Sequence, residues 1–452
     1  MSAAGKALGK VSVAILSWNG RAHLEICLGA LARQADPGVP WDIVVLDNGS
    51  SDGTVEWLRT AHPEVRVVAS SVNLGFCAGN NRLVAETDGD AIALLNNDTR
   101  PAPDWLAALV AALAAAPPDV AAVSGRIVDW PGERLDFARG VMTFDGHAFQ
   151  LDFRRPLAEA RIPAAGDELL FACGGNMLVR RRSFLDAGGF DEGYFAYLED
   201  VDLGWRLWAG GERVTFAPDA LVHHRSSATS DLLGLFNRGF LFERNAFLTA
   251  YKNYEAGLWE RVMPALLLTF LSRTQTMLVD NNPGGGSLTV DPYAGWIANT
   301  AGPAATPSPG SSGVPPHPAE PWTVARVLRK LREHGPRESA RRGWARLQRR
   351  ILPAPAAAGP ASPCLTDERT VAQFRALSYL LRHLDTAAER RAWAQRRRRR
   401  SDREIFERFP LYLVPTYPGD EALFASPGFQ AWLPPDLPLV RCRLAEVMDL
   451  KG

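Results

Sequence analysis

Short apolar runs alternate with helical patterns over the first 130 residues, and this alternation limits the possible folds more than any other feature. The runs contain few polar residues, which is typical of strands that are buried on both faces. Strand–helix alternation with short connections predicts an α/β fold in which helices cover a mostly parallel sheet. The predicted strands are Val11–Leu16, Ile43–Leu46, Val65–Ala69, Ala91–Leu95 and Val120–Val123, and the predicted helices are Ala22–Arg33, Thr54–His62, Phe76–Glu86 and Asp104–Ala115.

The later segments predict a less regular organisation. Residues 134–180 have the pattern of short antiparallel structure, a helix is expected after Asp200, and a further strand is expected over Arg213–Phe216. Residues 231–280 have the pattern of long helices. The chain is therefore divided into an α/β domain over residues 1–230, a helical extension over 231–282, a linker rich in Gly, Pro and Ser over 283–320, and a basic helical region over 321–452.

Composition narrows the class of protein. The 452 residues are 46% hydrophobic and 22% charged, which excludes a wholly disordered or collagen-like chain. The five cysteines form no C-x-x-C pair, so we expect a reducing compartment and no structural zinc site. The N-terminus lacks the apolar core of a secretory signal. The most apolar stretch, Val262–Val279, is interrupted by Pro264, Arg273 and Gln275, so it predicts a buried or interfacial helix instead of a membrane span.

A net charge of zero conceals a basic C-terminal third. Residues 320–452 contain 25 Lys and Arg against 15 Asp and Glu, whereas residues 1–319 contain 25 against 35. Arg-rich helical patterns over 322–350 and 366–409, with five consecutive arginines at Arg396–Arg400, are typical of a solvated helix face or of a helix on an anionic membrane surface. Both interpretations stay open for residues 320–400. No RNA-binding module or zinc finger accompanies the charge, so no nucleic-acid partner is expected.

Polar clusters follow the predicted strands, at the edge where parallel sheets bind ligands. Asp47 and Asn48 offer the acceptors that a pyrimidine imide N–H requires, although a turn before a helix uses the same residue types. Asp98 ends the run Asn96-Asn97-Asp98, where a carboxylate can hold a divalent cation that bridges a diphosphate. An Asx turn before Pro101 explains that run equally well.

A second group of candidates lies further along the chain. Glu199, Asp200 and Asp202 stand at an expected helix start, where one of them can accept a proton from a hydroxyl nucleophile. Burial and repulsion between the carboxylates raise the pKa of such a base, but acidic residues at a helix start also simply complement the helix dipole. His223 and His224 end an apolar strand and suit either a structural role or a metal site.

The order and spacing of these motifs resemble the family 2 glycosyltransferases. The resemblance covers about residues 10–255 and is greatest for the bacterial branch that includes rhamnosyltransferases of cell-surface polysaccharide assembly. Its motifs are Ser17-Trp18-Asn19, Asp47-Asn48-Gly49-Ser50-Ser51-Asp52-Gly53-Thr54, Asn73-Leu74-Gly75-Phe76, Gly79-Asn80-Asn81, Asn96-Asn97-Asp98, Gly189-Phe190-Asp191-Glu192, Glu199-Asp200 and His223.

The resemblance implies a GT-A fold, an inverting mechanism, a nucleotide-diphosphate sugar donor and a divalent metal, Mg²⁺ or Mn²⁺. It implies that Asp200 is the general base with Glu199 beside it, and that Asp98 and His223 meet the metal or the diphosphate, with His223 ranked above His224. Asn96 stands where the family's D-x-D motif begins with Asp. The implied donor site contains Ser17, Trp18, Asn19, Asp47, Asn48, Asn73, Gly75, Asn80, Asn96, Asn97 and Asp98, and the implied acceptor and sugar pocket contains Gly174, Gly175 and Asn176.

The expected function is therefore transfer of a sugar, such as rhamnose, from a dTDP- or UDP-linked donor to a glycan or lipid-linked acceptor in cell-envelope polysaccharide biosynthesis. We expect a cytoplasmic enzyme that can lie peripherally on the inner face of the plasma membrane. A sugar nucleotidyltransferase and a non-catalytic scaffold that keeps the fold are the alternatives.

Overall fold

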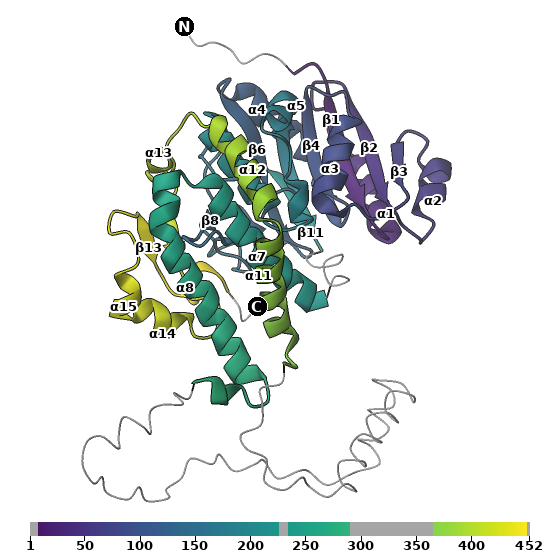
Figure 1. The fold of residues 1–452 in the computed structure, drawn as a ribbon. Coiled ribbons are helices and arrows are strands. Elements are labelled where there is room, and N and C mark those ends of the chain that lie inside the picture. Colours follow the sequence, from purple (N-terminus) through teal and green to yellow (C-terminus); the bar gives the residue numbers. More distant parts are fainter. Residues whose placement is uncertain (1–7, 226–233, 290–364, 450–452) are drawn as a thin grey trace, which may run out of the picture. The chain divides into compact units, whose positions relative to one another are not determined.

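The computed structural model describes residues 8–225, 234–289 and 365–449. The chain divides into two compact units, one made of residues 1–278 and 366–452 and the other of residues 279–365. The first unit contains the sheet and the helices that cover it (Figure 1). This grouping differs from the division into consecutive domains given above, because the described C-terminal residues belong to the same unit as the α/β domain.

A nine-stranded sheet runs through the first unit in the order β3-β2-β1-β4-β10-β6-β11-β5, with β7 paired to β6 (Figure 1). The strands β3, β2, β1 and β4 are parallel, as their apolar runs predicted. β10 runs antiparallel to both β4 and β6, and β11 is parallel to β6. The bounds are β1 Val11–Ser17, β2 Trp41–Asn48, β3 Arg66–Ser70, β4 Ala91–Asn96, β5 Thr99–Pro101, β6 Val120–Asp129, β7 Leu135–Phe137, β10 Asn176–Arg180 and β11 Arg213–His224.

The predicted N-terminal helices are confirmed within two residues at each end. The antiparallel structure expected over residues 134–180 is confirmed by β7 and by the small β8–β9 pair. A buried aromatic core joins helices to the sheet, with Trp105 on α4 and Trp205 and Trp208 on α6 inaccessible to solvent. The bounds are α1 Arg21–Leu31, α2 Thr54–Ala61, α3 Gly75–Ala85, α4 Trp105–Ala115, α5 Arg181–Asp186, α6 Glu199–Ala209, β8 Gly140–Met142 and β9 Ala148–Gln150.

Two long helices follow the sheet, α7 (Gly234–Asn253) and α8 (Ala256–Asn281). α8 is the described helix whose length and composition would suffice to cross a membrane. It buries one face, and the polar Arg273 lies on that face with 3% of its side chain exposed. Leu267, Leu268 and Leu271 lie on the exposed face. The prediction of a helix over Val262–Val279 is confirmed, and its interpretation as a buried or interfacial helix instead of a membrane span stays a prediction.

The described C-terminal residues wrap around α6 and α7. α11 (Glu368–Arg382) and α12 (Leu384–Arg396) pack along α7, and the Gln395 side-chain amide donates to the α7 carbonyls of Lys252 and Asn253 at 2.9 and 3.1 Å. The Pro-spaced tail contains a parallel pair of short strands, β12 with β13. The remaining bounds are α13 Asp402–Phe406, β12 Leu411–Leu413, α14 Asp420–Ala425, α15 Pro427–Gln430, β13 Leu439–Arg441 and α16 Leu444–Val447.

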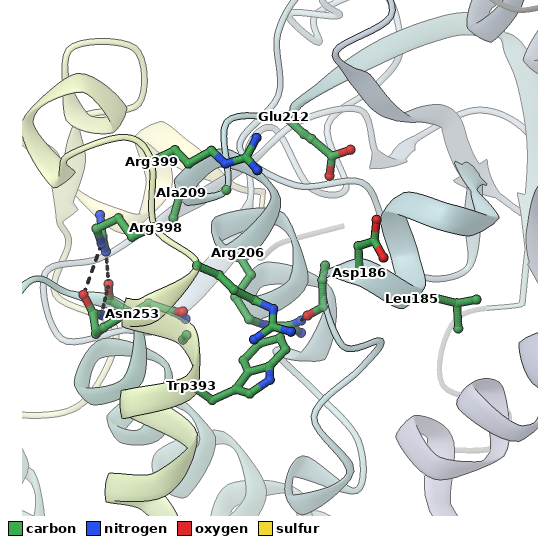
Figure 2. Close-up of a pocket in the computed structure, with 14 residues that line it drawn as sticks. Leu185, Asp186, Arg206, Ala209, Glu212, Asn253, Trp393, Arg398 and Arg399 are labelled. Carbon is green, nitrogen blue, oxygen red and sulfur yellow. Dashed lines mark hydrogen bonds between the residues drawn. The ribbon is translucent and has the colours of Figure 1, made fainter.

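The five-arginine block is only partly a surface feature. It borders a cavity of about 410 Å³ against the C-terminal end of α6 (Figure 2). Arg398 donates to the carbonyl of Asn253, and Arg400 donates to the carbonyls of Gly211 and Glu212 at 2.7 and 2.6 Å. These two arginines therefore hydrogen-bond to carbonyl groups at the end of α7 and just after the end of α6, where backbone carbonyls lack partners within the helix. They do not form the solvated or lipid-facing surface that the sequence suggested. The Arg-rich pattern over 322–350 and most of the predicted linker lie outside the described residues.

Candidate active site

A cavity of about 310 Å³ opens at the carboxyl ends of β1, β2 and β4 and is closed by the segment that leads into α6. This is the edge of the sheet where the sequence placed its polar clusters. The cavity wall brings together most of the predicted site residues, which are Trp18, Asn48, Asn73, Gly75, Asn96, Asn97, Asp98, Gly174, Gly175, Glu199 and Asp200. Leu16, Phe76, Phe195, Ala196, Tyr197, Cys173 and His224 complete it.

Some predicted site residues support the cavity without lining it. Ser17 is buried and its hydroxyl accepts from the Asn97 amide at 3.0 Å. Asn19 ties two loops together, since its backbone N–H donates to the Ser50 hydroxyl and its side-chain oxygen accepts from the Ser51 N–H, both at 2.8 Å. These contacts fix the loops after β1 and β2 relative to one another.

Three further predicted residues are buried and are not among the residues that line the cavity. Asn80 donates to the Phe76 carbonyl at 2.9 Å within α3. Asn176 accepts from the Trp105 indole at 2.8 Å and donates to the Ala220 carbonyl at 3.0 Å, so it joins β10, α4 and β11. Asp47 accepts from the Ser50 N–H at 3.1 Å through Oδ2, while its buried Oδ1 has no hydrogen-bond partner.

Asn48 organises the wall of the cavity nearest β2. Its side-chain nitrogen donates to Asn73 Oδ1 at 3.0 Å, and its side-chain oxygen accepts from the Leu74 N–H at 2.9 Å. Gly75 follows with a φ of +81°, and a Cβ built on it would lie 2.5 Å from the Phe195 ring. Glycine is therefore required here both by the backbone conformation and by the close approach of Phe195.

His224, and not His223, faces Asp98. The His224 Nε2 atom lies 3.3 Å from Asp98 Oδ1, whereas the His223 ring contacts the Trp130 carbonyl at 3.2 Å and packs over Gly132. Successive side chains of a strand point to opposite faces, so only one of two adjacent histidines can reach the cavity. The predicted ranking of His223 above His224 is corrected accordingly.

Asp136 holds the His224 ring in place, with Oδ2 2.8 Å from Nδ1. Burial alone would lower the pKa of His224, but the hydrogen bonds to Asp136 and Asp98 outweigh burial and raise it to about 10. An imidazolium has no lone pair for a metal, so His224 can hold a cation only by giving up this proton, and a cation beside Asp98 favours that loss. Asp136 behind the ring then provides the arrangement that orients metal-binding imidazoles. No motif in the sequence points to Asp136, which is a single acidic residue on the short strand β7.

Asp98 and His224 fit a weakly chelated divalent cation. The described part of the chain contains no cluster of three or more metal-binding side chains. Magnesium and related ions commonly use one or two protein ligands together with waters and substrate phosphates. Two converging side chains at the cavity edge therefore suit a cation that arrives with a diphosphate, and they do not suit a permanent structural ion.

Glu199, which is buried, and Asp200, which is half-buried, form a carboxyl pair at the N-terminal end of α6. Asp200 accepts from the backbone N–H groups of Gly174 at 3.3 Å and Val201 at 2.8 Å. Burial raises the pKa of Asp200 to about 6, against the opposing effect of these two hydrogen bonds. Burial, followed by repulsion from Asp200, raises the pKa of Glu199 well above its ordinary value. Asp200 is therefore mainly ionised at pH 7, and burial and repulsion favour the neutral form of Glu199 beside it.

Asp202 has a structural role. Its carboxylate is inaccessible to solvent and pairs with Arg206 and Lys252, both at 2.8 Å. Burial would raise the pKa of Asp202, but the two cations outweigh burial and lower it to about 2. Of the three carboxylates in this segment, only Glu199 and Asp200 face the cavity.

A loop with a strained backbone leads directly into the Glu199–Asp200 pair at the start of α6. Phe195, Tyr197 and Leu198 have φ angles of 64°, 69° and 63°, a conformation that side chains other than glycine rarely adopt. The Asn245 side-chain amide on α7 donates to the carbonyls of Tyr194, Ala196 and Tyr197 at 3.1, 2.8 and 2.8 Å. Strain of this kind persists only where the surrounding structure enforces it. No pattern in the sequence identified Asn245.

Known proteins resemble this chain in sequence and structure. The model of glycosyl transferase family 2 matches residues 12–187. The N-acetylglucosaminyl-diphospho-decaprenol L-rhamnosyltransferase of Mycobacterium tuberculosis is 33% identical over 228 residues, 46% of this chain and 73% of that protein. Glycosyltransferase AglE of Haloferax volcanii is 25% identical over 228 residues, 49% of this chain and 69% of that protein. The structure of GalNAc-T7 with UDP, GalNAc and Mn²⁺ aligns over 58% of this chain and 52% of that one, at 15% identity and a TM-score of 0.44.

Proposed function

The chain belongs to glycosyltransferase family 2 and has the GT-A fold, and from this premise we propose that it is an inverting enzyme with Asp200 as its general base. The observation that carries the proposal is the position of an ionised Asp200 and of the Asp98–His224 pair on the wall of one cavity. The proposed reaction moves a sugar from a nucleotide diphosphate to a hydroxyl group of a glycan or lipid-linked glycan.

Asp200 takes the proton of the acceptor hydroxyl as that oxygen attacks the anomeric carbon. The new C–O bond forms on the face of the sugar opposite the leaving group, and the bond from the anomeric carbon to the diphosphate breaks. A pKa of about 6 leaves Asp200 ionised at neutral pH while keeping it basic enough to accept a proton in the transition state. Burial and repulsion from Asp200 raise the pKa of Glu199 and so oppose a second negative charge in the site.

The diphosphate leaves with increased negative charge. A divalent cation, Mg²⁺ or Mn²⁺, stabilises that charge as a Lewis acid when it is bound, and Asp98 and His224 would hold it. Asp136 orients His224 for this purpose. Asn96 and Asn97 border the same part of the cavity and supply amide donors toward the phosphate oxygens.

The nucleoside end of the donor is assigned to the wall near β1 and β2. Trp18 gives an apolar surface for the base, and Asn48 and Asn73 supply amide groups on the same wall. The unpaired Oδ1 of Asp47 is an acceptor of the kind that a pyrimidine imide N–H satisfies. We propose a dTDP- or UDP-linked donor, with rhamnose as the first sugar to test because a 33% identical relative is named a rhamnosyltransferase.

The acceptor proposed first is a lipid-linked N-acetylglucosamine diphosphate, again from the name of that relative. Such an acceptor implies work at the inner face of the plasma membrane by a cytoplasmic enzyme. We assign the acceptor sugar to the part of the cavity bordered by Gly174 and Gly175, beside Asp200. A Cβ on Gly175 would lie 2.7 Å from the Asn96 amide, so a larger residue there would displace the cavity wall.

The test uses the full chain with a panel of UDP-, dTDP- and GDP-sugars, with and without Mn²⁺. A ligand that binds the folded state raises the melting temperature by mass action, so the panel reports both the base and the need for a cation. We expect a cation-dependent shift with one pyrimidine nucleotide sugar, followed by transfer of its sugar to the lipid-linked acceptor. No shift with any nucleotide sugar would instead support a non-catalytic scaffold.

A further inference from the structure

Two arginines share one tryptophan beside the candidate active site. The guanidinium groups of Arg100 and Arg225 lie over the Trp130 ring, 4.8 and 4.3 Å from its centroid. Arg100 also donates to the Trp130 carbonyl at 3.4 Å. The two cations are therefore within about 9 Å of one another, held by the ring that attracts both of them.

The cluster of Arg100, Arg225 and Trp130 lies at the same ends of β5 and β11 as Asp98 and His224, the two residues proposed to hold the metal ion. In the antiparallel register of β5 and β11, His223 pairs with Arg100 and His224 pairs with Thr99. The Arg225 N–H donates to the Asp98 carbonyl at 3.0 Å. Paired residues of two strands point to the same face of the sheet, so Arg100 shares a face with His223, and Arg225, two residues after His223, shares that face around Trp130. His224 points the other way, toward Asp98 in the cavity.

Within the described part of the chain, no carboxylate neutralises the positive charge of this cluster. Among the described residues, neither Arg100 nor Arg225 has a carboxylate within salt-bridge distance. The nearby acids are already engaged, since Asp129 accepts three backbone N–H groups at 2.8 to 3.0 Å and Asp98 and Asp136 pair with His224. Two unneutralised arginines stacked on an aromatic ring form a preorganised site for an anion.

We propose that Arg100 and Arg225 bind the diphosphate group of the acceptor, and that Trp130 holds their guanidinium groups ready for it. The guanidinium fork matches phosphate oxygens with two parallel hydrogen bonds, which a lone ammonium group does not provide. The donor diphosphate is assigned to the cavity at Asp98 and His224, so the adjoining cluster is left for a second diphosphate. This inference rests on the proposed function and adds the residues that recognise the acceptor.

The experiment compares two acceptors with the full-length enzyme and a saturating donor. One probe is N-acetylglucosaminyl diphosphate with a short phenylalkyl chain, and the other is octyl N-acetylglucosaminide, which contains no phosphate. The Arg100→Gln, Arg225→Gln double variant is expected to raise the KM of the diphosphate acceptor at least tenfold. The KM of the octyl glycoside, the KM of the donor and the donor-induced thermal shift are expected to stay within twofold of wild type.

The matched control is Arg397→Gln. The Arg397 guanidinium also lies over a tryptophan ring, 4.1 Å from the centroid of Trp393, but it borders the cavity at the C-terminal end of α6 and not the active site. The Arg397→Gln variant is expected to leave the KM of the diphosphate acceptor and the KM of the octyl glycoside unchanged. Arg100→Lys, Arg225→Lys retains the charge without the fork, and we expect it to restore only part of the acceptor affinity.

Three outcomes would overturn the inference. An equal rise in the KM of both acceptors, or a rise in the KM of the donor alone, would show that the arginines do not recognise the acceptor diphosphate. Loss of binding to anionic phospholipid vesicles with unchanged acceptor kinetics would assign them to lipid headgroups instead. A wild-type enzyme that transfers no sugar from any nucleotide donor would remove the proposed function itself, a result distinct from the first two.

Discussion

Asn245 donates a hydrogen bond from its side-chain amide to the Tyr197 carbonyl oxygen at 2.8 Å, two residues before the buried Glu199. The same amide reaches the carbonyls of Ala196 and Tyr194. One side chain therefore holds three carbonyls of a loop whose backbone is strained at Phe195, Tyr197 and Leu198. The loop forms one wall of the cavity and ends in the carboxyl pair, so its shape sets the position of Asp200.

We predict that Asn245→Leu lowers kcat at least tenfold while the KM of the donor changes little. Leucine fills a similar volume but donates no hydrogen bond, so the carbonyls of Ala196 and Tyr197 lose the Asn245 donor and the strained loop relaxes, while the Tyr194 carbonyl keeps its bond from Arg244. Steady-state kinetics separate the two parameters. Thr269→Val, which removes a buried side-chain bond to the Ala265 carbonyl on α8, is the control for general destabilisation. A fall in kcat of equal size in both variants would contradict a specific effect on the loop.

Replacement of Asp200 tests the general base directly. Asp200→Asn is expected to lower the transfer rate by about 10²–10⁴-fold, the usual contribution of a positioned base. Binding of the donor, measured by its thermal shift, should be nearly unchanged because the substitution keeps the shape of the side chain. Asp219→Asn, at an exposed position of β11, is the matched control. Turnover of Asp200→Asn close to that of wild type would exclude Asp200 as the base.

The pH profile of kcat/KM should have an acidic limb near pH 6. Burial raises the pKa of Asp200 to about 6, and the base acts only when it is ionised, so activity falls as the pH decreases through that value. An ordinary aspartate would give a limb near pH 4. Glu199→Gln is expected to leave the limb in place, because the raised pKa of Glu199 favours the neutral form that glutamine imitates. A limb near pH 4, or its loss in Glu199→Gln, would assign the titration to a different group.

The two adjacent histidines give a prediction with an internal control. His224→Ala should raise the Mn²⁺ concentration needed for half-maximal activity at least tenfold, because it removes the side chain that faces Asp98 at 3.3 Å. His223→Ala should change that concentration less than twofold, since His223 packs over Gly132 on the other face of the strand. Titration of activity with Mn²⁺ checks both variants. A larger effect of His223→Ala than of His224→Ala would contradict this assignment and would support His223 as the metal-binding residue, as the sequence suggested.

Local patterns were sufficient to predict the α/β half of the fold. The apolar runs around Val13, Val45 and Ala93 have one interpretation as buried parallel strands, and the polar residues that end them were expected to share one edge of the sheet. Trp18, Asn48 and Asp98 do line one cavity at that edge. The acidic residues at the start of α6 were also predicted, because the sequence places three carboxylates directly before a helical pattern.

Features that depend on register and long-range packing were not predictable in this way. The choice between His223 and His224 depends on which face β11 turns to the cavity, and β11 has register irregularities relative to β6. Asn245 acts on a loop almost 50 residues earlier in the chain. The sequence suggested that Arg398 and Arg400 are surface charges. Only the arrangement of α6 and α7 shows that both donate hydrogen bonds to carbonyl groups at or just after the ends of these helices.

A buried ionic contact joins the C-terminal segment to the body of the first unit. Arg273 on α8 is 3% exposed and lies 2.9 Å from both Asp145, just before β9, and Asp420, at the start of α14. Both carboxylates are almost fully buried, so each depends on a partner to stay charged. Loss of the cation would leave two desolvated negative charges, with only His147 near Asp145 to compensate.

We therefore predict that Arg273→Met lowers the free energy of unfolding by about 3–5 kcal/mol, the usual cost of removing one partner from a buried ion pair. Urea denaturation of the full chain measures this change. The matched control is Arg261→Met on the same helix, where Arg261 and Asp436 are 51% and 65% exposed and contribute little because water screens them. If both variants unfolded at the same urea concentration, the buried contact would not be what holds the α14 segment against α8 and the β8–β9 pair.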